Sequence, residues 1–190
     1  MKELRLAEIR AATPAGGQAL ILEGRPIVFG VPTTINDPAG AYTEVIQRGA
    51  LDGADLSDVR LLYNHDTGRV PLARTPRTMQ LEISPAGLEM RATLPDTEDA
   101  RAVHEAVRRG DLSGMSFAFV VRKGGDSYEA RTNTRTISKI DKVLECSVVP
   151  YPAYPTASVE ARSAMSAGLL SLQARNEAKI LAHKILRVRV

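Results

Sequence analysis

The 190-residue chain has one cysteine, no tryptophan and only 4% aromatic residues. Its single cysteine, Cys146, cannot form an internal disulfide, which excludes a disulfide framework. The three histidines, His65, His104 and His183, lie too far apart for a zinc-finger or metalloprotease spacing. We therefore predict no metal and no cofactor. The scarcity of aromatic side chains also disfavours a stacking platform for single-stranded nucleic acid.

Long hydrophobic runs are missing as well. No stretch of about eighteen apolar residues occurs, so we expect no transmembrane helix and no membrane partner. The first ten residues, MKELRLAEIR, lack the apolar core of a signal peptide. Hydrophobic residues at 44% and charged residues at 25% are typical of a soluble globular protein. With one cysteine, no signal peptide and no transmembrane helix expected, a reducing cytoplasmic compartment is the default prediction.

Charge of either sign is nearly balanced, with a formal net charge of +3 from 25 basic and 22 acidic residues. The excess is local, because residues 161–190 hold six Lys/Arg and one acid, a net of +5. Residues 1–160 hold nineteen Lys/Arg and twenty-one acids, a net of −2. This distribution argues against a basic nucleic-acid-binding barrel and predicts no specific nucleic-acid partner.

Hydrophobic periodicity predicts many short strands and one clear helix. Asp96 is the predicted N-cap of the helix over 97–109, which ends at Gly110. Residues 44–54 carry a weaker helical pattern, and 30–40 are dense in turn residues and predict a loop. Strands are expected within 19–29, 59–63, 78–94 (a hairpin turning at 84–87), 115–122, 127–132 and 135–149.

The fold class that follows is mostly β with helices (α+β), and an antiparallel β-barrel with attached helices is the natural architecture. Three prolines in the six residues 150–155 then forbid regular structure. Beyond them the composition shifts to Ala, Leu, Lys and Arg without proline. We therefore predict a domain over 1–162 and a basic, helical or flexible tail over 163–190.

Three residue types that together catalyse acyl transfer occur at strand positions: Ser116, His65 and Glu145. A serine hydroxyl needs a neighbouring base, histidine titrates near neutral pH, and a carboxylate can fix the histidine tautomer. Strand alternation places Ser116 on the face of the smaller side chains, opposite the large apolar ones. It also places Glu145 on the more polar face of its strand, together with Val143 and Ser147.

Each candidate also has an ordinary structural interpretation. Ser116 can be a small barrel residue, His65 a turn residue bonded to its own backbone, and Glu145 a solvated residue paired with a nearby lysine. His104 lies one position away from the apolar stripe of its helix and is expected on the surface. Cys146 lies on an apolar face and is expected in the core. Spacing alone does not join the three candidates, because catalytic triads are defined by geometry.

Three segments in register carry a family resemblance. They resemble the prohead (capsid maturation) serine proteases of tailed bacteriophages, and the similarity covers roughly residues 19–160. The stretch EVIQRGAL at 44–51 is similar to the segment that precedes the family's histidine. The three segments are LLYNHD at 61–66 followed by PLAR at 71–74, GDLSGMSFAF at 110–119, and LECSVVPYPAYP at 144–155.

The resemblance implies a β-barrel related to the herpesvirus assembly proteases, which cut scaffold inside an immature capsid. It implies that Ser116 is the nucleophile, His65 the base, and Glu145 the residue that orients His65. Because herpesvirus relatives use a second histidine as third member, His104 and Asp66 compete with Glu145 for that role.

The same resemblance implies a serine endopeptidase that acts in the host cytoplasm, inside the assembling prohead. Its expected partners are the viral scaffold and the major capsid protein. The sequence leaves open whether the protein also forms a homo-oligomer. Self-cleavage is expected near 155–170, where small residues dominate. Arg135 is a candidate for the oxyanion donor. The alternative function is a non-catalytic capsid assembly or scaffolding module of the same fold.

Overall fold

The computed structural model describes residues 9–12, 19–37 and 40–150 of the chain. The predicted tail over 163–190 and the predicted cleavage region at 155–170 lie outside these residues. Twelve strands and one helix are found in the described part: β1 Ile9–Ala12, β2 Leu20–Val28, β3 Thr33–Asp37, β4 Gly40–Ile46, β5 Arg60–Tyr63, β6 Ala73–Arg74, β7 Met79–Ser84, β8 Gly87–Leu94, α1 Glu98–Arg109, β9 Gly114–Val121, β10 Asp126–Glu129, β11 Thr134–Ile137 and β12 Ile140–Val149.

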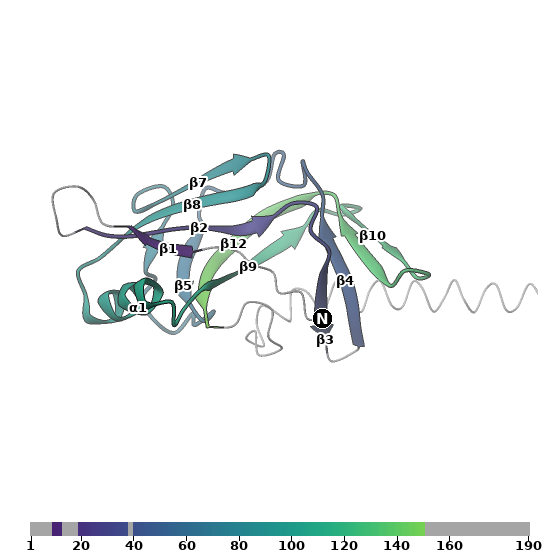
Figure 1. The fold of residues 1–190 in the computed structure, drawn as a ribbon. Coiled ribbons are helices and arrows are strands. Elements are labelled where there is room, and N and C mark those ends of the chain that lie inside the picture. The colour runs from purple at the N-terminus through teal and green to yellow at the C-terminus, as the bar shows by residue number, and fades with distance from the viewer. Residues whose placement is uncertain (1–8, 13–18, 38–39, 151–190) are drawn as a thin grey trace, which may run out of the picture. The chain divides into compact units, whose positions relative to one another are not determined.

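The strands form three four-stranded sheets, with strand orders β1-β2-β8-β7, β10-β11-β4-β3 and β6-β5-β12-β9 (Figure 1). Most neighbouring strands run antiparallel, as expected. Two pairs, β12 with β5 and β11 with β4, are parallel. Parallel neighbours require a long connection, so segments that are distant in sequence meet at these two places.

The expected closed barrel is not found among the described strands. Each sheet ends on strands with one neighbour, so the hydrogen-bonded ladder is interrupted between sheets. The sheets instead share one apolar core, to which Leu22 of β2, Leu61 of β5 and Ile137 of β11 contribute fully buried side chains. The core is therefore buried by packing between the faces of the sheets, and not by closure of the strands into a barrel.

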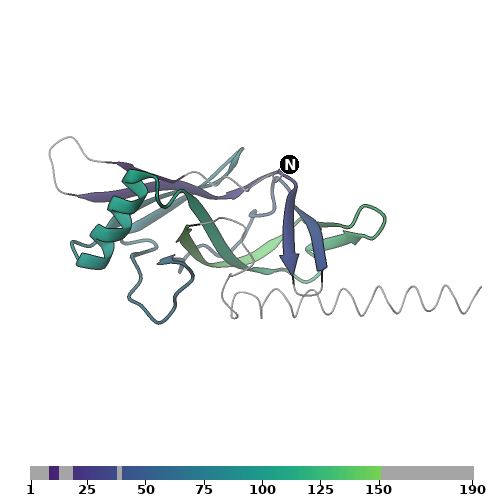
Figure 2. The same cartoon turned by 60° about the horizontal axis from the view of Figure 1, so that its bottom comes forward.

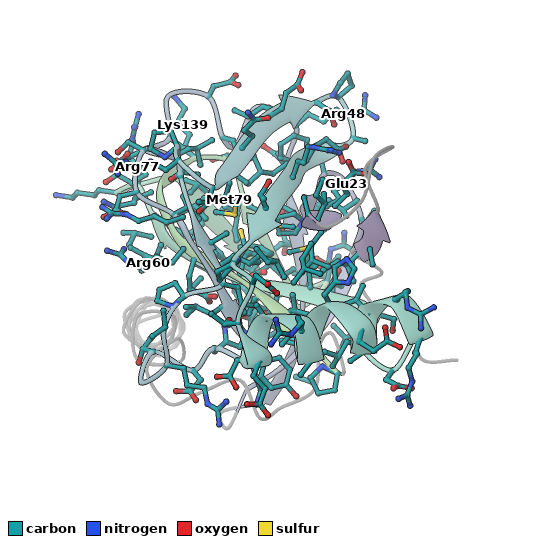
Figure 3. The ribbon with its side chains drawn as sticks, turned by 90° about the vertical axis from the view of Figure 1, so that its left-hand side faces the viewer. Glu23, Arg48, Arg60, Arg77, Met79 and Lys139 are labelled. Atoms are coloured by element: carbon teal, nitrogen blue, oxygen red, sulfur yellow. The ribbon has the colours of Figure 1, made fainter. Side chains whose placement is uncertain are left out.

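The hairpin predicted over 78–94 is confirmed as β7 and β8, which turn through Pro85 and Ala86. Met79 at the start of β7 is buried and points inward, whereas Arg60, Arg77 and Lys139 point to the outside (Figure 3). On its other side β8 pairs with β2, with Gly87 opposite Val28. A Cβ atom on Gly87 would lie 1.9 Å from the carbonyl oxygen of Ile27, so only glycine permits this approach.

Helix α1 is confirmed, but its N-cap is Thr97 and not Asp96. The Thr97 hydroxyl accepts a hydrogen bond from the amide of Ala100, and Gly110 closes the helix with φ of 84°. The helix packs against β1 and β2 (Figures 1 and 2). The prediction that His104 is a surface residue is wrong: it is 9% exposed, because the buried stripe of α1 is wide enough to include it.

The helical interpretation of residues 44–54 is also wrong. Residues up to Ile46 belong to strand β4, and turns follow as far as residue 53. Within β4 the alternate residues Tyr42, Glu44 and Ile46 are buried. The strand pattern was obscured because one of its inward positions is a glutamate, which pairs with Arg135 of β11. Likewise β3 occupies part of the predicted loop at 30–40.

No helix in the described ranges is long and apolar enough to cross a membrane. The same ranges contain no cluster of three or more His, Cys, Asp or Glu side chains suited to hold a metal ion.

Candidate active site

The candidate site is built on β12, the strand between β5 and β9 (Figure 1). Its residues from Glu145 to Val149 are all buried. A central strand covered on both faces is expected to be largely apolar. Glu145 and Ser147 are therefore the exceptions that need polar partners inside the protein.

A register irregularity in β12 precedes the site. Val143 pairs with Phe119 and Glu145 with Ala118, so β12 carries one extra residue at this point. The extra residue reverses the alternation, and Val143 joins the apolar core together with Cys146 and Val148. The expectation that Val143 shares a face with Glu145 is therefore wrong.

A tight turn after β5 positions His65. Asn64 and His65 both adopt left-handed backbone conformations, with φ of 52° and 58°. The amide of Asp66 donates to the carbonyl of Tyr63 at 3.0 Å, which closes the turn. Asparagine and histidine are among the few non-glycine residues that tolerate this region. The Asn64 amide also donates to the Val148 carbonyl at 2.9 Å, which fastens the turn to β12.

The turn brings His65 to Glu145, 80 positions later in the sequence. Nδ1 of His65 lies 2.6 Å from Oε1 of Glu145, and the two side chains are 5% and 11% exposed. An ionised carboxylate only accepts hydrogen bonds. The contact therefore assigns a hydrogen to Nδ1, so that in the neutral imidazole the lone pair is on Nε2, the form in which histidine acts as a base.

Ser147 holds the second oxygen of the same carboxylate. Its Oγ donates to Oε2 of Glu145 at 2.6 Å and accepts from the backbone amide of His65 at 3.1 Å. The residue is completely buried. Sequence reasoning did not select Ser147, although a signal was present, since two positions along a strand return to the same face.

Ser116 lies on β9, directly opposite Ser147 of β12. Facing residues of neighbouring strands point to the same side of the sheet, with Cβ atoms about 5 Å apart. Glu145 is opposite Ala118, so it is the diagonal neighbour of Ser116 on that side. Ser116 is half-buried, whereas Ser147 is fully buried. Of these two serines, only Ser116 is reachable from outside.

In the described part of the chain, no hydrogen bond joins Ser116 to His65. Pairing of β9 with β12 places Ser116 on the same face of the sheet as Glu145. The carboxylate of Glu145 in turn binds the imidazole of His65. Contacts between a nucleophile and its base are often long before substrate binds and tighten in the reacting complex. The structure therefore joins two of the three predicted residues directly and places the third on the facing strand.

The competing candidates for the third role have other contacts. Asp66 is exposed and turns toward its own loop, where Oδ1 accepts from the Gly68 amide at 2.9 Å. His104 is buried on α1, and its Nε2 has no hydrogen-bond partner in the described residues. Neither residue is bonded to His65.

Arg135, the candidate oxyanion donor, belongs to a different sheet. Its guanidinium pairs with Glu44 at 3.1 Å and with Asp126 at 2.8 Å. Burial disfavours the charged guanidinium, but the two carboxylates outweigh this effect and the pKa of Arg135 is raised. The side chain is thus committed to a buried ion network that holds β4, β10 and β11 together.

Cys146 is buried in the core, as predicted. Burial, with a smaller effect from the charge of Glu145, raises the pKa of its thiol. A thiol that stays protonated is a poor nucleophile. Although Cys146 is adjacent to Glu145, its chemistry is that of a small apolar residue.

In a comparison with known families, residues 6–169 match the caudovirus prohead serine protease family. The match spans most of the chain and includes all three candidate residues, and the chain therefore belongs to this family. It is a serine peptidase of the tailed-phage prohead, a class that functions in capsid maturation. Comparisons with curated proteins and with solved structures found no match.

Proposed function

We propose that this protein is an endopeptidase in which Ser116 is the nucleophile, His65 the general base and Glu145 the residue that orients the base. The observation that carries the proposal is the buried contact of 2.6 Å between Nδ1 of His65 and Glu145. In the neutral imidazole this contact leaves Nε2 able to accept a proton, and the strand that pairs with β12 carries the half-buried Ser116 opposite Ser147. A base of this kind near a serine is what hydroxyl activation requires.

The proposed reaction is a two-step acyl transfer. Nε2 of His65 takes the proton of Ser116 Oγ while Oγ bonds to the carbonyl carbon of a peptide. His65 then gives this proton to the amine nitrogen as the C–N bond breaks, which leaves an acyl-enzyme. Water attacks the ester, again with His65 as base, and releases the acid and the free serine. In both steps the charge of Glu145 stabilises the imidazolium.

The substrates that we propose are segments of the scaffold or of the major capsid protein, cleaved inside the assembling prohead in the host cell. Family membership supports an association with prohead proteins in general. Extended, solvent-exposed segments of such proteins are the form in which a polypeptide enters a protease groove.

Self-cleavage within residues 155–170 is a separate part of the proposal. This stretch contains several small residues, among them Ala157, Ser158 and Ala161. It follows β12 closely in the sequence. Mass spectrometry of the purified protein should show a product ending in this range, and that product should be missing for Ser116→Ala. Only full-length chain from an enzyme with reactive Ser116 would contradict self-cleavage.

A fluorophosphonate probe tests the catalytic assignment without knowledge of the cleavage site. We expect covalent labelling of the wild-type protein at Ser116, identified by peptide mapping, and no labelling of Ser116→Ala at an unchanged melting temperature. Ser147→Ala should remain labelled at Ser116. Wild-type protein that resists the probe, or a Ser116→Ala protein that still processes scaffold at the wild-type rate, would overturn the assignment and favour a non-catalytic assembly module.

A further inference from the structure

Among the residues that the structure describes, Ser147 carries the one hydroxyl that is hydrogen-bonded to both members of the His65–Glu145 pair. Its Oγ donates to Oε2 of the carboxylate at 2.6 Å and accepts from the backbone amide of the histidine at 3.1 Å. The side chain is fully buried on the central strand. It therefore has no access to substrate, and its influence must pass through the two residues that it holds.

The first consequence concerns the carboxylate. The terminal torsion of a glutamate is broad, so a single hydrogen bond leaves its oxygens free to rotate. In this site Oε1 is bonded to His65 Nδ1 and Oε2 to Ser147 Oγ, which fixes both oxygens. Because Ser147 lies two positions after Glu145 on the same strand, the donor is anchored by the sheet itself.

The second consequence concerns the histidine backbone. His65 adopts a left-handed conformation with φ of 58°, which is costly for a residue with a side chain. Its amide points into the buried region and would lack a partner without the Ser147 hydroxyl. The same oxygen atom thus stabilises the unusual backbone that directs the imidazole and the carboxylate that receives its hydrogen.

We propose that Ser147 is a positioning residue of the catalytic machinery, which fixes the Glu145 carboxylate and the His65 turn in the geometry that activates Ser116. This inference rests on the proposed function of those three residues. It assigns Ser147 no bond to substrate and no proton transfer, and it predicts that its effect depends on the carboxylate that it holds.

A double-mutant cycle tests this dependence. The readout is the second-order rate of fluorophosphonate labelling at Ser116, with melting temperatures recorded for every variant. Ser147→Ala should lower the rate on the order of 10- to 100-fold, the range found for outer hydrogen-bond partners of functional side chains at metal sites. In a Glu145→Ala background the same change should lower the rate by a clearly smaller factor, because no carboxylate remains to be positioned and only the hydrogen bond to the His65 amide is lost.

Steady-state kinetics add a second readout. With a peptide selected from a mixed library by wild-type cleavage, Ser147→Ala should lower kcat while KM stays within about threefold, because a buried residue does not contact substrate. Ser138→Ala is the matched control. It removes a hydroxyl that donates to the Gly125 carbonyl at 3.0 Å in the β10–β11 sheet region, and it should keep the wild-type rate.

Nuclear magnetic resonance separates failure of this inference from failure of the proposed function. The hydrogen shared between His65 Nδ1 and Glu145 should give a far-downfield proton signal in the wild type and in Ser116→Ala. Ser147→Ala should lose or broaden this signal through faster exchange. That result holds whether or not Ser116 proves to be the nucleophile, so it tests the positioning of the pair alone.

Two results would overturn the inference. One is a Ser147→Ala protein with wild-type labelling rate and an unchanged downfield signal. The other is an equal loss of rate from Ser147→Ala in the wild-type and Glu145→Ala backgrounds, which would assign Ser147 a general structural role. If Glu145→Ala does not fold, the proton signal and the split between kcat and KM decide between these outcomes.

Discussion

Replacing Glu145 by glutamine separates the charge of this side chain from its hydrogen bonds. The amide oxygen can accept from His65 Nδ1, and the amide nitrogen can donate to Ser147 Oγ, because a hydroxyl both donates and accepts. The Ser147 hydroxyl hydrogen, which Oε2 of the carboxylate accepts in the wild type, loses that acceptor in Glu145→Gln, at a cost of about 1–3 kcal/mol. We expect this variant to fold, with a melting temperature lowered by several degrees.

The lost charge matters only when His65 becomes a cation during the reaction. Two unit charges about 4 Å apart interact by about 4 kcal/mol at an effective dielectric constant of about 20. The side chains of His65 and Glu145 are 5% and 11% exposed, so solvent screens them little. An energy of this size corresponds to about 10³ in rate. The retained hydrogen bond keeps the imidazole oriented, so we expect a loss between about 10² and 10³.

The assay is the rate of fluorophosphonate labelling at Ser116, supported by peptide cleavage. Glu105→Gln is the control, since Glu105 is an exposed carboxylate that pairs with Arg108 on α1. It should react at the wild-type rate. A Glu145→Gln protein within threefold of wild type would refute the electrostatic reasoning. A loss as complete as that of Ser116→Ala would refute the assignment of Glu145 as an orienting residue.

Three further predictions concern stability. Gly87→Ala forces a Cβ atom to within 1.9 Å of the Ile27 carbonyl oxygen, and urea titration should show a loss on the order of 3 kcal/mol. Gly53→Ala, with φ of 74° and nothing within 4 Å, should lose only about 1 kcal/mol, and equal losses would contradict the steric argument. Native Cys146 should resist iodoacetamide at about pH 8 and should react once urea unfolds the protein. Because burial raises the pKa of this thiol, it stays protonated in the folded protein when the unfolded thiol ionises. The free energy of unfolding should therefore decline as pH rises above about 8.5. Thr97→Ala should lower the free energy of unfolding by about 1 kcal/mol through loss of the N-cap hydrogen bond, as thermal melts would show. Thr97→Ser keeps a capping hydroxyl and should keep the wild-type free energy of unfolding.

Local patterns predicted the elements whose neighbours in space are also neighbours in sequence. The β7–β8 hairpin follows from alternation and a turn of Ser, Pro, Ala and Gly, and α1 follows from its apolar stripe and its glycine stop. The strand β4 was missed because Glu44 occupies an inward position. A carboxylate is tolerated there because Arg135, 91 positions later, lies beside it.

In the candidate site, too, some features follow from the sequence and others depend on contacts between distant segments. The sequence pointed to Ser116, His65 and Glu145 because these residue types are suited to acyl transfer and because their segments resemble one family. It did not predict the extra residue in β12, which depends on pairing with β9. It also did not exclude Asp66 or His104, whose contacts depend on how the loop and the helix pack.

By itself, therefore, the sequence determined the residue types, the polar and apolar faces of most strands, and the family. Only the tertiary structure decided which groups meet. The parallel pairing of β12 with β5 carries the turn at Asn64 to the end of β12, and the hydroxyl of Ser147 connects the two. The physical reason is that periodicity specifies which face of a strand a residue occupies, whereas strand order and register specify what that face meets. Both are set by burial of the shared core, a property of the whole chain.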